Sequence, residues 1–214
     1  MKEIGISGYS VYVEETTDTT KDPQIIEIQY NSLFDTNYLR DKILIEIGAR
    51  SLMEPSENVK IRSIIAESYP ETDFADDYFT VPTVVPQRTF LEKAFLLHEE
   101  FQKPTEKIRV DRMSRHIYDL EKMMDTDFAI DALNDGELYN AIVAHRSTLT
   151  KMKEVDYTTH TLDKINFIPP LNVIDLWKAD YESMQKNMIY GKSLPFDELI
   201  DRIKELNKRF RSIE

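Results

Sequence analysis

Three charged residues in the middle of the sequence have the types and spacing needed to bind a nucleotide. Lys93 lies at the edge of an apolar stripe that contains Phe90 and Leu97 at helical spacing. A lysine held there can present a point charge to phosphates, or it can lay its stem on the core and extend its ammonium into solvent. Arg115 and Asp119 are four residues apart, so they are neighbours on one face of a helix. Either they form an ordinary surface ion pair, or Asp119 is an acid that faces the nucleotide or Lys93 and Arg115 orients it.

Two glutamates in the first third of the chain are candidate ligands of a divalent cation. Alternation along residues 42–47 places Glu46 opposite the isoleucines of that segment, and Glu27 is opposite its own neighbouring isoleucines in the same way. If the two segments are adjacent strands, the carboxylates share one face, and paired carboxylates suit Mg²⁺. The alternative is that both point into water. The isoleucine face is expected to be core.

The composition excludes several other kinds of site. The chain of 214 residues has no cysteine, which excludes disulfides, thiolate zinc sites and a cysteine nucleophile. Its four histidines are scattered without the pairing of a zinc site, and no glycine-rich phosphate loop is present. The net charge of −12 opposes extended binding to nucleic acid, so any RNA contact must be local.

These candidate residues must be positioned by two kinds of secondary structure. Segments rich in isoleucine and valine predict strands at residues 11–14, 25–30, 42–47 and 59–65. From Arg88 onward the apolar residues recur with a helical period. The pattern predicts an α+β fold, with a sheet-rich part over residues 1–80 and a helical domain over residues 81–214. Three apolar stripes are expected to form the helical core: Phe90, Ala94, Leu97 and Phe101; Met113, Ile117, Leu120 and Met124; Trp177, Tyr181, Met184 and Met188.

The start of the chain has no targeting signal that the sequence makes visible. Residues 1–17 lack the basic start and unbroken apolar run of a secretory signal, and no later segment approaches the length of a membrane span. We expect a soluble, cytoplasmic protein without membrane contact.

The order of several segments resembles one family, the AbiEii/AbiGii nucleotidyltransferase toxins of type IV toxin–antitoxin systems, which act in abortive infection against phage. The segments that carry the resemblance are YNSLFD (30–35), LIEIGAR (44–50), VPQRTFLEKAFLLHEEF (85–101), RMSRHIYDLEKM (112–123) and IVAHR (142–146). The resemblance implies a sheet similar to part of the nucleotidyltransferase domain of DNA polymerase beta, followed by a helical domain. It also implies metal-dependent transfer of a nucleotide from an NTP to an acceptor such as tRNA, with Mg²⁺ as cofactor and a cognate antitoxin as partner.

The resemblance also assigns roles to individual residues. The family's lysine matches Lys93 in FLEK, and its downstream acid matches Asp119 in SRHIYDL, with Arg115 in the same motif. Lys93 and Asp119 are therefore the expected catalytic residues, and Lys93 and Arg115 the expected nucleotide-binding residues. Glu46 corresponds to the later strand carboxylate of the metal site. Glu27 joins it only through the shared face described above.

One feature of the family has no match in residues 1–24, namely a glycine-rich turn followed by two aspartates spaced as D-x-D. Those aspartates bind the metals that activate nucleotidyl transfer. We therefore expect the chain to represent the C-terminal portion of such a toxin, to be inactive by itself, and to leave the carboxylate-bearing face of its sheet open. The alternative function is a non-catalytic module that binds a partner protein or a structured RNA.

Overall fold

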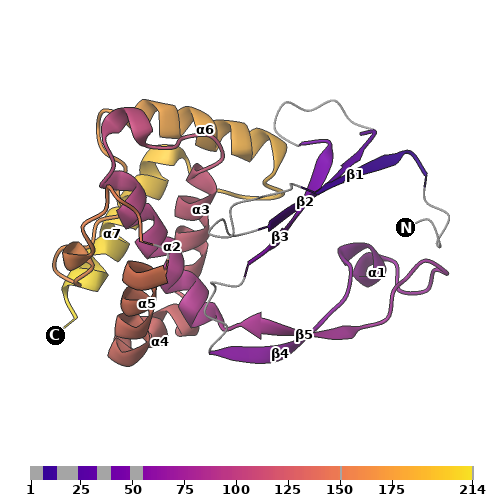
Figure 1. The fold of residues 1–214 in the computed structure, drawn as a ribbon, viewed down its shortest axis with the longest axis horizontal. Helices are drawn as coiled ribbons and strands as arrows, with labels where there is room; N and C mark the ends of the chain where they lie inside the picture. Colours follow the sequence, from indigo (N-terminus) through magenta and orange to yellow (C-terminus); the bar gives the residue numbers. More distant parts are fainter. Residues whose placement is uncertain (1–6, 14–23, 33–39, 49–54, 150, 214) are drawn as a thin grey trace.

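The strands, with one short helix, occupy one end of the molecule in the computed structural model, and the longer helices occupy the other (Figure 1). The structure describes residues 7–13, 24–32, 40–48, 55–149 and 151–213. Within these residues it contains five strands in two antiparallel sheets and seven α-helices, so the predicted α+β class is confirmed. The sheets come first in the chain and the main helices follow, which is the order that the change of apolar period predicts.

The first sheet is antiparallel, with strand order β1 (Tyr9–Val13), β2 (Gln24–Tyr30) and β3 (Lys42–Ile47). Its register pairs Ile25 with Glu46 and Glu27 with Leu44. Because residues paired across two strands point to the same side, Glu27 and Glu46 lie on one face, which we call the carboxylate face. This confirms the arrangement expected from alternation.

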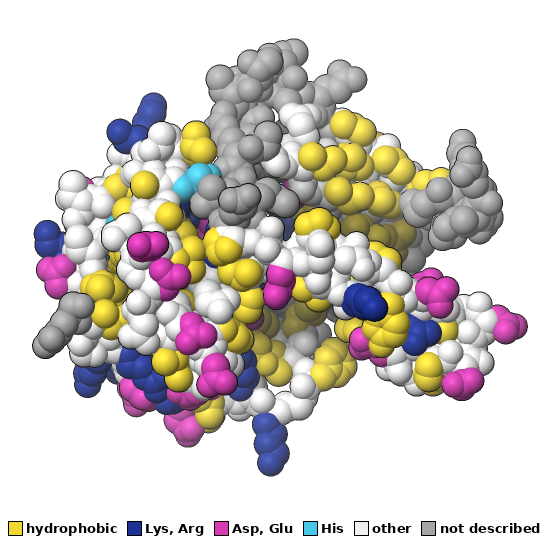
Figure 2. Space-filling view, turned by 90° about the horizontal axis from the view of Figure 1, so that it is seen from below, with side chains coloured by type: hydrophobic (Ala, Val, Ile, Leu, Met, Phe, Trp, Pro, Cys, Tyr) yellow, Lys and Arg dark blue, Asp and Glu magenta, His cyan; other side chains and the backbone are white. Residues whose placement is uncertain are grey.

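The opposite face of this sheet, the isoleucine face, was expected to be core, and that prediction was wrong. Ile43, Ile45 and Ile47 are 52%, 41% and 56% exposed, and Val11 and Val13 on β1 are also exposed. Alternation identifies an apolar face, but burial requires a second layer, and the described helices pack mainly on one another. Figure 2 shows hydrophobic side chains gathered over the strand-bearing part of the molecule. The carboxylate face is also open among the described residues, since Tyr12 and Leu44 on it are 54% and 38% exposed and Glu46 is exposed, so both faces of this sheet are exposed.

The second sheet is a two-stranded hairpin of β4 (Ser56–Ile61) and β5 (Phe79–Val84), with the short helix α1 (Ile64–Ser68) between its strands. The predicted strand at 59–65 therefore ends at Ile61. The chain turns into a helix because the Ser63 side chain accepts a hydrogen bond from the Ala66 backbone N–H at 3.1 Å. Strand β5 was not predicted because it contains Pro82, which an edge strand tolerates and a central strand does not.

The helical part is built around α2 (Pro86–Phe101), which contacts α3 (Ser114–Met123), α4 (Asp127–Asn134) and α5 (Gly136–Leu149). Helices α6 (Ile174–Asn187) and α7 (Phe196–Arg211) pack on α3. Two short 3-10 helices, Thr105–Lys107 and Tyr157–Thr159, lie in the connections. The three predicted stripes form the core, except that Met188 is exposed and Phe101 is only partly buried.

A buried polar network ties α2 to α5 and to the segment around residue 160. Glu99 accepts hydrogen bonds from Arg146, and His160 lies 3.3 Å from the same carboxylate. His98 contacts the Thr159 hydroxyl at 3.0 Å, and its ring lies edge-on to that of His160. Burial lowers the pKa of His98 to about 4, and the neighbouring His160 acts in the same direction. His98 is therefore neutral at pH 7.

Among the described residues, no helix combines the length and the apolar composition that crossing a membrane requires.

Candidate functional site

Lys93 on α2 and Asp119 on α3 form an ion pair, with 2.7 Å between Nζ and Oδ2. Their side chains are 23% and 38% exposed, so the pair is partly buried at the surface of the helical domain. Helices α2 and α3 pack against each other through their apolar stripes, which brings the two charged edges together. The contact expected between Lys93 and Asp119 is confirmed, and Lys93 does not simply extend into solvent.

His116 lies in the same charged surroundings. Burial, together with the positive charges of Lys93 and Arg115, lowers the pKa of His116 to about 4, against an opposing effect of Asp119. Its Nδ1 is buried and has no hydrogen-bond partner in the part of the chain that the structure describes. The sequence showed His116 only as one of four scattered histidines. The structure places a neutral imidazole beside the Lys93–Asp119 pair.

A pocket of about 500 Å³ lies between strand β3 and the segment that leads into α3. We call it the basic pocket, because five of its lining residues are cationic and two are acidic in a chain whose net charge is −12. Such a local excess of positive charge is the chemistry that binds phosphate groups. The pocket is lined by Tyr30, Arg40, Lys42, Leu44, Glu46, Arg109, Asp111, Arg112, Met113 and Arg115.

Two carboxylates hold residues 109–114 in place, the buried Glu100 and the half-buried Asp180. Glu100 on α2 accepts hydrogen bonds from the backbone N–H and the guanidinium of Arg109, at 2.7 and 2.8 Å. Asp180 on α6 accepts from the backbone N–H groups of Arg112 and Ser114, at 2.7 and 2.9 Å, and from the Ser114 hydroxyl. Asp180 thus caps the start of α3 and stabilises Arg112 at a φ of 58°, a conformation that costs energy for a residue other than glycine. The Arg109 guanidinium and the backbone at Arg112 are therefore held by carboxylates of α2 and α6.

Arg115 is exposed at the edge of the basic pocket. Its side chain has no ion pair or hydrogen bond among the described residues, and the pair expected between Arg115 and Asp119 does not form because Asp119 is paired with Lys93. Arg115 lines the basic pocket and lies one helical turn before Asp119. It therefore connects the pocket to the Lys93–Asp119 pair, neither member of which lines the pocket itself.

The two glutamates differ in how free their oxygens are. Glu46 is exposed and lines the basic pocket, whereas both oxygens of Glu27 accept hydrogen bonds, one from Gln29 and one from Lys42. These bonds hold the pKa of Glu27 below its ordinary value. The described residues contain no group of three or more potential metal ligands, so Glu46 and Glu27 do not form a complete cation site. Glu46 fits Mg²⁺ as a single protein ligand, since Mg²⁺ commonly takes one or two carboxylates and completes its shell with phosphate oxygens and water.

The sequence contains a D-x-D at Asp125 and Asp127, between α3 and α4. The Asp125 carboxylate forms ion pairs with Arg202 and Arg209 of α7, and these arginines lower its pKa. Asp125 therefore ties the connection between α3 and α4 to α7, and neither aspartate of this D-x-D lines the basic pocket.

Sequence reasoning missed four of the five cations in the basic pocket. Arg109, Arg112 and Arg115 recur at every third position, a spacing that could have identified a basic surface before a helix. Arg40 and Lys42 on the first sheet gave no comparable signal, because their proximity to the arginines depends on how the sheet and the helices meet.

A basic pocket beside a paired lysine and aspartate on an α+β fold has the chemistry that suits an anionic ligand. A family model described as nucleotidyl transferase AbiEii toxin, type IV toxin–antitoxin system, matches residues 2–202. The chain therefore belongs to the AbiEii nucleotidyl transferase toxin family, and the resemblance read from its motifs is confirmed. No curated protein and no solved structure matches it.

Proposed function

We propose that this protein takes part in transferring a nucleotide from an NTP to an acceptor such as tRNA, as the toxin of a toxin–antitoxin pair that acts in phage defence. The observation that carries the proposal is the placement of Arg115 between the basic pocket and the Lys93–Asp119 ion pair. Family membership supports the reaction class, and the arrangement of charges supports an anionic nucleotide as the ligand.

The basic pocket has the charge and the rigidity to hold a triphosphate. The guanidinium of Arg109 is held by the buried Glu100, so binding would cost little side-chain entropy there, and the backbone of Arg112 is fixed by Asp180. Arg115 has no competing partner among the described residues and is available to a phosphate oxygen. Lys93 would release Asp119 and bind the phosphate group that is transferred.

Glu46 would hold the expected Mg²⁺ together with phosphate oxygens of the bound nucleotide. When bound, the ion would supply charge neutralisation at the phosphates. Glu27 would act indirectly, because its carboxylate holds the ammonium of Lys42, a lining residue of the pocket, at 2.5 Å. Asp119, released from Lys93 by the nucleotide, would face the acceptor hydroxyl.

Transfer of radiolabel from an NTP to total RNA, in the presence of Mg²⁺, tests this function. We expect no transfer by the 214-residue chain alone, because nucleotidyl transfer needs cations at both the attacking and the leaving oxygen. Adding a family segment with a glycine-rich turn and D-x-D should restore transfer. Lys93→Ala or Asp119→Asn should then remove most of it, whereas Lys107→Ala, in an exposed ion pair that does not line the basic pocket, should not.

Strong transfer by the 214-residue chain alone would contradict the expected need for further carboxylates. Glu46 and Glu27 would then be the first ligands to test, with Glu46→Gln and Glu27→Gln. Restored transfer that survives Lys93→Ala would contradict the assigned site.

A non-catalytic, protein-binding module is the second candidate function, and the exposed isoleucine face favours it. In that case a co-expressed cognate antitoxin should co-elute with the protein, and Ile45→Lys should abolish co-elution. Co-elution unchanged by Ile45→Lys, or no complex at all, would remove this candidate.

A further inference from the structure

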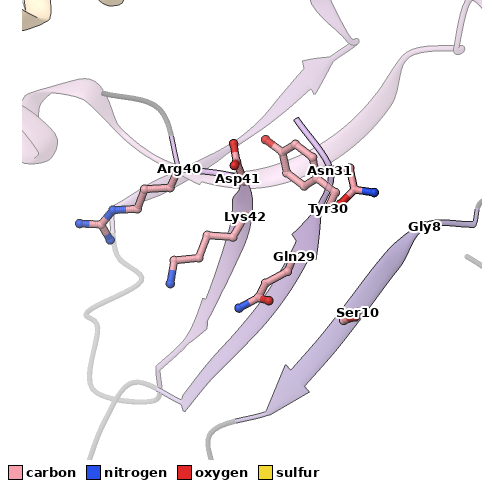
Figure 3. Close-up of a pocket in the computed structure, with 8 residues that line it drawn as sticks. All are labelled: Gly8, Ser10, Gln29, Tyr30, Asn31, Arg40, Asp41 and Lys42. Carbon is pink, nitrogen blue, oxygen red and sulfur yellow. The ribbon is translucent and has the colours of Figure 1, made fainter. Parts of the chain in front are cut away.

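A second pocket adjoins the basic pocket at the end of the first sheet (Figure 3). We call it the end pocket; its volume is about 330 Å³. Tyr30, Arg40 and Lys42 line both pockets, so the two are continuous. The end pocket is lined by Gly8, Ser10, Gln29, Tyr30, Asn31, Arg40, Asp41 and Lys42.

The strand register explains how the two pockets are connected. Ser10 pairs with Gln29 and Gln29 pairs with Lys42, so the three residues form one row across the carboxylate face. In Figure 3 the side chains of Gln29 and Lys42 extend to the same side, together with that of Arg40. A polar path therefore leads from the end pocket across β2 and β3 to the basic pocket.

The end pocket differs from the basic pocket in the groups that it offers. Asn31 and Asp41 are exposed, and neither side chain has a hydrogen-bond partner in the described part of the chain. An amide and a carboxylate together offer donors and acceptors of the kind that recognise the edges of nucleobases. Tyr30 is 42% exposed and offers a ring on which an unpaired base can stack. These groups suit a base better than they suit a phosphate chain.

The two cations between the pockets suit the phosphate that accompanies such a base. Arg40 pairs with Asp111 at 3.7 Å, but both side chains are at least half exposed, and an exposed pair of this kind contributes little energy. Arg40 can therefore exchange Asp111 for a backbone phosphate. Lys42 stands beside it in the shared lining, so a strand running from the end pocket toward the basic pocket would meet positive charge at the junction.

We propose that the end pocket binds the terminal unpaired nucleotide of an acceptor nucleic-acid strand, with its base on Tyr30 and its phosphate on Arg40, and directs the strand end toward the basic pocket. The inference rests on the proposed function, because it requires the basic pocket to hold the NTP. A nucleobase of the NTP itself has the same chemistry, and the test separates the two sources.

The test measures two affinities of the full chain by fluorescence anisotropy, one for a short labelled single-stranded RNA and one for a labelled NTP. The variants are Tyr30→Ala, Arg40→Ala, Arg115→Ala and Lys93→Ala. Tyr190→Ala serves as the matched control, because Tyr190 is 98% exposed on the connection after α6. Circular dichroism and thermal melting confirm that each variant is folded.

We expect Tyr30→Ala to weaken RNA binding by about tenfold, the effect of losing one base-stacking contact, and to leave NTP binding unchanged. Arg40→Ala should weaken RNA binding and reduce its salt dependence. Arg115→Ala should weaken NTP binding, and a fully paired RNA duplex should bind less well than the single strand because it has no unpaired base.

Two results would overturn the inference while leaving the proposed function intact. The first is RNA binding that is unchanged in Tyr30→Ala, with NTP binding still weakened by Arg115→Ala. The second is NTP binding that is weakened by Tyr30→Ala, which would assign the end pocket to the base of the NTP. NTP binding that is indifferent to Arg115→Ala and Lys93→Ala would instead overturn the proposed function.

Discussion

Removing the charge of Asp119 should strengthen NTP binding, although it should also abolish the transfer that an added D-x-D segment restores. Lys93 and Asp119 are 2.7 Å apart in the free protein, so a phosphate must replace Asp119 as the partner of Lys93. With side chains 23% and 38% exposed, the pair contributes about 1 kcal/mol, near the upper end for surface ion pairs. Asp119→Asn should therefore raise NTP affinity by about fivefold.

Lys93→Ala should have the opposite effect on binding. Losing a hydrogen bond to a charged phosphate costs about 1.5 to 3 kcal/mol, which corresponds to a decrease in affinity of roughly 10- to 150-fold. Because Asp119 is expected to act on binding through Lys93, the double variant should bind as weakly as Lys93→Ala alone. The double-mutant cycle should thus show a coupling of about 1 kcal/mol rather than additivity.

Isothermal titration calorimetry of the four proteins with a non-hydrolysable NTP measures all the terms of this cycle. Glu154→Gln is a suitable control, since Glu154 pairs with Lys107 at 2.6 Å in a comparable exposed pair outside the site. If Asp119→Asn weakens NTP binding, or if the two substitutions are additive, Asp119 does not compete with phosphate for Lys93 and the reasoning is refuted.

Two further predictions concern stability. The pKa of His98 is lowered from 6.5 to about 4, so between these values the unfolded chain binds a proton that the folded chain does not, and stability falls as pH drops. Urea unfolding should show a loss of about 1 kcal/mol from this group between pH 7 and 5.5, and His98→Gln should flatten the dependence; an unchanged slope in that variant would contradict the assignment. Asp180→Asn should lower the free energy of unfolding by about 2 kcal/mol and weaken NTP binding, because it disrupts the acceptor that holds Ser114 and the preceding arginine. Asp175→Asn on the same helix, at an exposed position, is its control, and equal effects of the two substitutions would argue against a specific anchor.

Local pattern predicted much of the helical part and of the first sheet. Helical spacing marked Phe90, Ala94 and Leu97 as core, and all three are fully buried, because an amphipathic helix presents one stripe to its neighbours whatever those neighbours are. Alternation placed Glu27 and Glu46 on one face, because the period of a strand decides which residues share a side. The motifs around Lys93 and Asp119 identified the family, which the match over residues 2–202 confirms.

Several features required knowledge of what lies beside each element. Alternation predicted that the isoleucines of β3 would be core, yet they are exposed, since burial depends on a covering layer that no local pattern specifies. Strand β5 escaped prediction because only its position at a sheet edge makes Pro82 acceptable.

The sequence by itself thus determined the chemistry that is available, namely which residues carry charge and which side of each helix or strand they occupy. Only the tertiary structure decided which charges meet. Asp119 pairs with Lys93 rather than with its helical neighbour Arg115, and the arginines before α3 face Arg40 and Lys42 of the first sheet across one pocket. Electrostatic interactions weaken with distance and with solvent exposure, so the function of a charged residue depends on the packing that brings distant segments together.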